Sequence, residues 1–167
     1  MASRVAHFID ELHRAFDGDP WHGPSLMALL RKVGAAEAER HPVPGAHSIG
    51  EITAHLTAWT NEVARRLTGF PAGPPPEGDW PPSLAATPAG WAAMTLALTT
   101  AVATLETAVA GFPEARWDLP IVDPREPLPV TPVSYDQLVH GLAQHFAYHG
   151  GQIALLSKAL GIGYGHE

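Results

Sequence analysis

Apolar residues recur at every third or fourth position in several segments of the chain, which is the spacing of helices that bury one face. Residues 4–17 carry such a stripe and end before Gly18. A shorter apolar segment, 24–33, has Pro24 or Ser25 at its start and ends before Gly34. Proline suits the first turn of a helix and glycine suits the position after its end, so this pattern predicts a long helix followed by a short one.

Two further segments begin with a capping box, in which a serine and a Glu or Gln three residues later each satisfy a backbone donor at the start of a helix. Ser48 with Glu51 begins an apolar stripe that ends before Gly69. Ser134 with Gln137 begins the longest stripe of the chain. We therefore expect two long helices in these segments. The apolar seam of the second one consists of Leu138, Leu142, His145, His149, Ile153, Leu156 and Leu160.

Another helix is indicated by Thr87 and Pro88, a cap residue followed by a proline in the first turn. The residues that follow are apolar in nearly every direction until Gly111. A helix of this kind is expected either to be largely buried or to face a partner chain with half of its surface. The second alternative predicts a homodimer.

Two long connections are rich in proline, which is excluded from helix interiors and from central strands. Residues 70–83 contain six prolines and two glycines. Residues 112–133 are interrupted in the same way, although their LPIV and LPVT segments could pair briefly. The chain is thus predicted to be all-α, a single domain over residues 1–167 that forms a four-helix bundle with long proline-rich loops.

Composition and charge exclude several classes of function. The chain has 167 residues, of which 46% are hydrophobic, and a net charge of −7 with its basic residues scattered. Nucleic-acid binding depends on clustered Lys and Arg and is not expected. The N-terminal region lacks the apolar core of a signal peptide, and no segment approaches the ~18 apolar residues of a membrane span. We therefore expect a cytoplasmic protein that does not contact a membrane.

The chain has no cysteine and 10 histidines. The absence of cysteine excludes disulfides, thiolate zinc sites and a protein thiol as nucleophile. Histidine is therefore the ligand class that, besides carboxylates, this sequence offers to a metal ion.

His145 and His149 lie four residues apart on the last predicted helix, so that both imidazoles can reach one ion from the same side. Spacing alone is weak evidence, because chance gives roughly 0.6 such pairs in a chain with this histidine content. Both residues, however, replace apolar residues in the seam of the helix. A buried polar group without a partner costs roughly 1 to 3 kcal/mol, and one shared cation would satisfy both.

His55 is the third candidate ligand, because it lies at the edge of the apolar stripe that follows Ser48. Three imidazoles from two facing helices suffice for a metal site inside a bundle. The alternative for each histidine is a position at the edge of the core, hydrogen-bonded to a carbonyl or a carboxylate. His22 and His47 lie in turns that could fold over such a site.

Parts of the chain resemble the DinB/YfiT-like family of metal-dependent enzymes, namely WHGPSL (21–26), PGAHSIGEITAHLTAW (44–59), DWPP (79–82) and HFAYHGGQI (145–153). Of these, the H-x-x-x-H-x-G-Q-I pattern is the most specific. Members of the family are four-helix bundles with a three-histidine metal site, which the resemblance places at His55, His145 and His149. Some relatives are bacillithiol-dependent or mycothiol-dependent S-transferases or isomerases, so the resemblance also implies a low-molecular-weight thiol.

Three imidazoles leave coordination positions open, as in a catalytic site for a divalent metal. Zinc or nickel is expected, with iron and manganese as alternatives. A thiol or a water bound there would lose its proton more readily. The candidates for a general base are Glu51, His22 and His47, although Glu51 also suits the capping box.

Four more residues are candidates for the wall of the site or for positioning a ligand, namely Trp21, Trp59, Tyr148 and Gln152. Gln152 either orients His149 or points to solvent. Trp59 lies on an apolar stripe and so also suits the core. Gly150 and Gly151 are expected to let another backbone approach closely.

The sequence therefore supports two functions for the same fold. The first is a metal-dependent enzyme, a transferase or a hydrolase, that activates a small thiol or water against a small electrophilic substrate. The alternative is a metal-binding or interaction protein without turnover. A third interpretation treats the histidines as structural.

Overall fold

The computed structural model describes residues 3–124 and 132–163. Its elements are α1 (Arg4–Asp17), α2 (Leu26–Leu30), α3 (Ala35–Ala38), α4 (Ile49–Leu67), α5 (Pro88–Ala110), the short 3-10 helix η1 (Glu114–Arg116) and α6 (Tyr135–Ala159). Within the described residues, extended pairing is limited to an isolated bridge between Pro120 and Ser134. The predicted all-α fold is confirmed.

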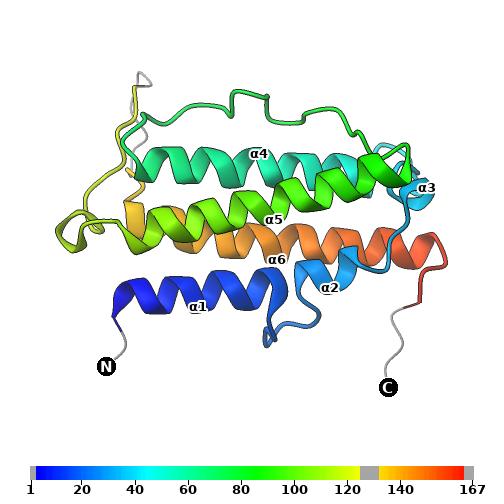
Figure 1. The fold of residues 1–167 in the computed structure, drawn as a ribbon, viewed down its shortest axis with the longest axis horizontal. Helices are drawn as coiled ribbons and strands as arrows, with labels where there is room; N and C mark the ends of the chain where they lie inside the picture. The colour runs from blue at the N-terminus through cyan, green and yellow to red at the C-terminus, as the bar shows by residue number, and fades with distance from the viewer. Residues whose placement is uncertain (1–2, 125–131, 164–167) are drawn as a thin grey trace.

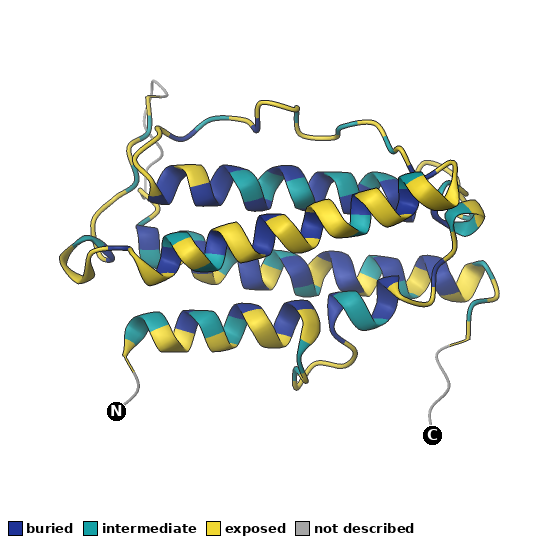
Figure 2. Ribbon diagram, in the orientation of Figure 1, coloured by how far each residue is buried: buried dark blue, intermediate teal, exposed yellow. Residues whose placement is uncertain are grey.

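The long helices α1, α4, α5 and α6 lie side by side along the long axis of the molecule (Figure 1). α4 packs against α5 and α6, and α1 packs against α6 and α5. Buried and exposed residues alternate along each long helix (Figure 2). Their inward faces form an apolar core that contains Leu12, Leu56, Leu98, Phe146 and Ile153. This packing fixes the faces of α4 and α6 that meet.

Both predicted capping boxes are present. The Ser48 side chain accepts the backbone N–H of Glu51 at 3.1 Å, and Glu51 accepts that of Ser48 at 2.8 Å. Ser134 and Gln137 make the same exchange at 3.2 Å and 3.0 Å. Because each box satisfies backbone donors that a helix start leaves without partners, α4 and α6 begin at the residues that the sequence indicated.

The first proline-rich loop connects two helices that run in the same direction, α4 and α5 (Figure 1). The chain must therefore return along α4, whose 19 residues extend roughly 28 Å at about 1.5 Å per residue. Residues 70–87, which we call the strap, cover this distance without forming a helix. Extended proline-rich chain advances about 3.1 Å per residue, so the strap has the length that this crossover requires.

α5 is buried on one face only, so the first of the two alternatives, a largely buried helix, is wrong, and the second, a face toward a partner chain, stays a prediction. Trp91, Leu98 and Leu105 are among the residues on its inner face. The outer face consists mainly of alanine and threonine, and threonine hydroxyls there, such as that of Thr104, donate to carbonyl groups one turn earlier. No segment long and apolar enough to span a membrane was expected from the sequence, but α5 has the length and composition of one. Of its most apolar stretch of 18 residues, 33% is buried in the structure.

Two predicted segments differ in detail from the structure. The helix expected at 24–33 is limited to α2, and Gly34 separates it from a second short helix, α3, which the sequence did not indicate. The brief pairing expected within 112–133 consists of the bridge at Pro120, where the Ile121 N–H donates to the Val133 carbonyl at 2.9 Å. The LPVT segment lies outside the described residues.

The buried face of α6 is wider than the predicted seam. It includes Tyr135, Val139 and Phe146, which the seam omitted, whereas Leu138 and His145 are only partly buried. The reason is that α6 packs against α1, α2 and α4 together, so its apolar face extends around the helix.

The two glycines after His149 do not both accommodate a close neighbour. A Cβ atom at Gly150 would make ordinary contact with Leu29 at 3.7 Å, and one at Gly151 would meet nothing within 4 Å. The expected close approach of another backbone is therefore not observed at either residue. Gly151 carries the conformational cost of glycine inside a helix without a steric reason for it.

We expect Gly151→Ala to raise the free energy of unfolding by about 0.5 to 1 kcal/mol, because alanine loses less backbone entropy in a helix. Urea unfolding followed by circular dichroism measures the change. Gly90→Ala is the matched control and should destabilise the protein, because its Cβ would collide with the Leu84 backbone carbonyl. A loss of stability in Gly151→Ala would contradict the open space at this position.

Candidate metal centre

Three histidines from two helices meet inside the bundle. His55 lies on α4, whereas His145 and His149 lie on successive turns of α6. The Nε2 atoms of His55 and His145 are 3.1 Å apart, and one ring nitrogen of each histidine lies within 4.8 Å of the others. His55 and His149 are only 5% and 4% exposed. The structure thus brings together the three residues that the sequence selected, which we call the histidine cluster.

The nitrogen spacing suits a divalent metal ion. Zinc–nitrogen bonds of about 2.0–2.1 Å at tetrahedral angles place two ligand nitrogens roughly 3.3 Å apart. The 3.1 Å between His55 and His145 is close to this value. Three protein ligands leave a coordination position free, as in catalytic rather than structural zinc sites.

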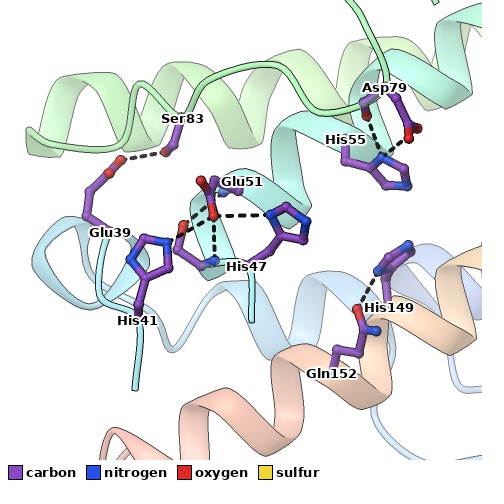
Figure 3. A network of polar contacts seen from close by, with 10 residues as sticks. Glu39, His41, His47, Glu51, His55, Asp79, Ser83, His149 and Gln152 are labelled. Carbon is purple, nitrogen blue, oxygen red and sulfur yellow. Dashed lines mark hydrogen bonds and ion pairs between the residues drawn. The ribbon is translucent and has the colours of Figure 1, made fainter. Parts of the chain in front are cut away.

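His55 is oriented by the strap. Its Nδ1 lies 2.6 Å from the backbone carbonyl oxygen of Asp79, to which the Nδ1–H donates (Figure 3). The Asp79 carboxylate is 3.4 Å from the same nitrogen and accepts the indole N–H of Trp59 at 2.7 Å. A proton held on Nδ1 leaves the lone pair on Nε2, which faces the other histidines.

His149 is oriented within its own helix. Its Nδ1 lies 2.6 Å from the side-chain oxygen of Gln152, one turn later on α6 (Figure 3). The Nδ1–H donates to this oxygen, so the Nε2 lone pair of His149 also remains available. Of the two alternatives for Gln152, the structure shows the one in which it orients His149.

Burial keeps the two histidines of α6 neutral. It lowers the pKa of His145 to about 4, with a further contribution from the nearby His149 and His55. Burial also lowers the pKa of His149, although the hydrogen bond to Gln152 opposes the change. Neutral imidazoles are the form that binds metal ions, so both residues are in the required state at neutral pH.

Trp80, which follows Asp79 in the strap, covers the cluster. Its ring stacks on His55 at a centroid distance of 3.9 Å and on His47 at 3.5 Å. Asp79 and Trp80 were not assigned roles from the sequence beyond their place in the DWPP segment. Helical periodicity gives no information about where an irregular segment lies, so their positions could not be inferred.

Two cavities flank the histidine cluster. One, of about 460 Å³, is lined by His55, His145, Trp59 and Arg66, and we call it the Arg66 chamber. The other, of about 380 Å³, is lined by His55, His149, Trp80, Tyr148 and Gln152, and we call it the Trp80 chamber. His55 and Asp79 line both. Small molecules can therefore reach the cluster from two sides.

A larger cavity, of about 830 Å³, lies elsewhere, between α4, the strap and the end of α5. Its lining includes Arg65, Glu77 and Phe112 but none of the three clustered histidines. The largest of these cavities is therefore not the one beside the candidate metal site.

The other predicted site residues fall into two groups. Trp59, Tyr148 and Gln152 line the chambers, and Trp59 is only half-buried, so it forms a wall instead of belonging to the core. Trp21 is fully exposed, at 102%, and His22 lines a separate small cavity beside Gly150. The turn that carries these last two residues does not fold over the histidine cluster.

Glu51 and His47 lie next to each other at the start of α4 (Figure 3). The Glu51 carboxylate accepts the backbone N–H of Ser48, which lowers its pKa, and it also contacts His41 at 3.1 Å. His47 lies 3.4 Å from the same carboxylate and lines the Trp80 chamber. Glu51 therefore caps the helix and reaches the chamber only through His47.

The stability of the metal-free protein should depend on pH through His145. The folded-state pKa, about 4, is below the ordinary value of 6.5, so between these values the unfolded chain binds more protons than the folded one. The contribution of His145 is therefore complete above pH 6.5 and is lost as the pH falls from 6.5 to 4. Urea unfolding of chelator-treated protein at pH 7 and pH 4.5 measures this loss.

The matched variant is His145→Gln, in which the side chain cannot titrate. We expect its free energy of unfolding to decrease less than that of the unchanged protein over the same interval. Equal decreases in the two proteins would show that His145 is not held neutral by burial.

The comparisons with known proteins agree with these observations. A family model described as the DinB superfamily matches residues 21–153. The matched segment contains α4, α5, the strap and all three clustered histidines. Neither the comparison with curated proteins nor the comparison with solved structures returned a match. Because the family match covers most of the chain, the protein belongs to the DinB superfamily.

Proposed function

We propose that the histidine cluster holds a divalent metal ion and that the protein is a metal-dependent enzyme. In this proposal it activates a small thiol or a water for transfer to, or hydrolysis of, a small electrophilic substrate. Zinc or nickel suits the all-nitrogen ligand set best, and iron and manganese are the alternatives. An external thiol is consistent with a chain that has no cysteine of its own.

The observation that carries the proposal is the convergence of three imidazoles, two of them oriented by hydrogen bonds, between two cavities. The Nδ1 atoms of His55 and His149 are each occupied by an oxygen 2.6 Å away, which directs both Nε2 atoms toward the centre. A bound divalent cation would lower the pKa of a thiol or a water and polarise an electrophilic oxygen. The chambers supply space for a nucleophile and an electrophile on different sides.

His47 is the best-placed residue to accept a proton from the nucleophile. It lines the Trp80 chamber together with His149, whereas His22 lies elsewhere and Glu51 is engaged at the helix start. The Glu51 carboxylate lies 3.4 Å from the His47 Nδ1 atom. Stacking on Trp80 holds the ring in place.

The competing function is a metal-binding protein of the same fold without turnover. The histidine cluster is compatible with both functions, since metal binding alone requires only the ligands. The two functions differ in whether replacing His47 changes a rate of turnover as well as the stability of the protein.

We expect the purified protein to contain about one equivalent of a divalent metal, and the His145→Ala, His149→Ala double variant to contain little, because two of three ligands are removed. Elemental analysis measures the content. The His7→Ala, His13→Ala double variant, which removes two exposed histidines of α1, is the matched control. Chelation of the metal should also lower the free energy of unfolding of the unchanged protein. The expected decrease is about 2.7 kcal/mol if the free ion is at 100 times its dissociation constant. Equal metal in both double variants would refute the site.

We expect the metal-loaded protein to turn over model electrophiles with bacillithiol, mycothiol, glutathione or water, and His47→Gln to reduce kcat about 10²- to 10⁴-fold, the range of a lost general base. Metal content of the variant should stay unchanged, because His47 is not a ligand. His41→Gln is the matched control, since it also contacts Glu51 but does not line the chamber. Absence of turnover with every nucleophile would favour the non-catalytic alternative.

A further inference from the structure

The Arg66 chamber has a buried cation in its wall. Arg66 is 8% exposed, and its guanidinium is fixed by two hydrogen bonds. The Nε–H donates to Glu62 at 3.0 Å, and Nη2 donates to the backbone carbonyl of Gly73 in the strap at 2.7 Å. A guanidinium presents five N–H donors in a rigid fork. Within the described residues these bonds leave the Nη1 group without a hydrogen-bond acceptor.

The carboxylate that pairs with Arg66 is shared with a second cation. The Glu62 carboxylate is almost fully buried and lies 3.0 Å from Arg66 and 3.6 Å from Arg65. The Arg65 side chain is 44% exposed and lines the other, larger cavity. In the Arg66 chamber itself, the donors that an anion could use are therefore the remaining N–H groups of Arg66.

Arg66 and the histidine cluster stand at a distance that one small molecule can bridge. The guanidinium carbon lies 5.7 Å from the Trp59 ring, and that ring lies 6.4 Å from the His55 ring. These distances place Arg66 within about 12 Å of His55. Apolar side chains such as Val63, Leu138 and Leu142 line the space between them.

We propose that the Arg66 chamber binds a small molecule with an apolar body and one carboxylate, which pairs with the Arg66 guanidinium while the opposite end reaches the histidine cluster. This inference rests on the proposed function for the role of that opposite end. A carboxylate matches a planar guanidinium and supplies one negative charge. Asp79, at the histidine end, repels the carboxylate and so orients the molecule.

The glycine at position 141 supports the inference that a ligand binds in the Arg66 chamber. Gly141 lines the Arg66 chamber one turn before His145, and a Cβ atom there would meet nothing within 4 Å. Glycine inside a helix costs about 1 kcal/mol relative to alanine. The glycine thus leaves open space in the wall of the Arg66 chamber, where a substrate would need it.

The test compares 3-phenylpropanoate with its neutral isostere 3-phenylpropanamide by isothermal titration calorimetry. The full chain is titrated as purified and after chelator treatment, so that binding to a metal and binding to Arg66 are separated. We expect the carboxylate to bind at least tenfold more tightly than the amide in both preparations, because its pairing with a guanidinium is charge-assisted. Equal affinities in the chelator-treated protein, or no binding of either compound, would overturn the inference.

The decisive variant is Glu62→Gln, Arg66→Gln, which removes the buried pair together and so avoids leaving one charge without its partner. We expect the affinity ratio to fall to about one. Arg65→Gln is the matched control, since Arg65 also contacts Glu62 but lines the other, larger cavity, and its ratio should stay at ten or more. A ratio that persists in the double variant would refute a role for Arg66.

Should the double variant not fold, Arg66→Lys takes its place, because lysine keeps the pairing with Glu62 but loses the planar fork. The ratio is then expected to fall at least threefold, and an unchanged ratio would refute the inference. Failure of the metal site is recognised separately: it would lower the metal content without changing the preference for carboxylate in chelator-treated protein.

Discussion

The structure depends on how three imidazoles, two of them buried and one partly buried, are satisfied in an apolar interior. Each ring has two nitrogens, and burial without partners is costly. For His55 and His149 one nitrogen is satisfied by an oxygen of Asp79 or Gln152, which leaves the second nitrogen directed to a common centre. Burial also prevents the α6 pair from becoming charged, with the pKa of His145 lowered to about 4. A shared cation is the partner that suits three imidazole nitrogens at this spacing.

The direction of the helices explains why an irregular segment forms part of this centre. α4 and α5 run the same way, so the strap must return along α4 and passes its histidine. Proline stiffens such an extended segment and reduces the entropy that it loses on folding. The strap can therefore hold Asp79 against His55 and Trp80 on its ring although neither residue belongs to a helix. The long connection is a structural part of the site.

The charges around the centre give the Arg66 chamber two different ends. Asp79 stands at the histidine end, and Arg66 stands at the far end, held by Glu62 and by the strap. Because the strap contacts both His55 and Arg66, the same segment orients the His55 ring and holds the Arg66 guanidinium in position. Both ends of the cavity thus depend on one crossover connection.

The sequence alone determined the four long helices and, for α1, α4 and α6, an apolar face. Capping boxes located the starts of α4 and α6, and four-residue spacing placed His145 and His149 on one side. It also selected His55, since periodicity identifies residues near a core. Other features cannot be inferred from periodicity and depend on the tertiary structure. They are the path of the strap, the wider buried face of α6, the exposed position of Trp21 and the contacts of Asp79 and Arg66. These depend on contacts between segments far apart in the chain, such as the 90 residues that separate His55 from His145, and on how packed helices rotate against each other.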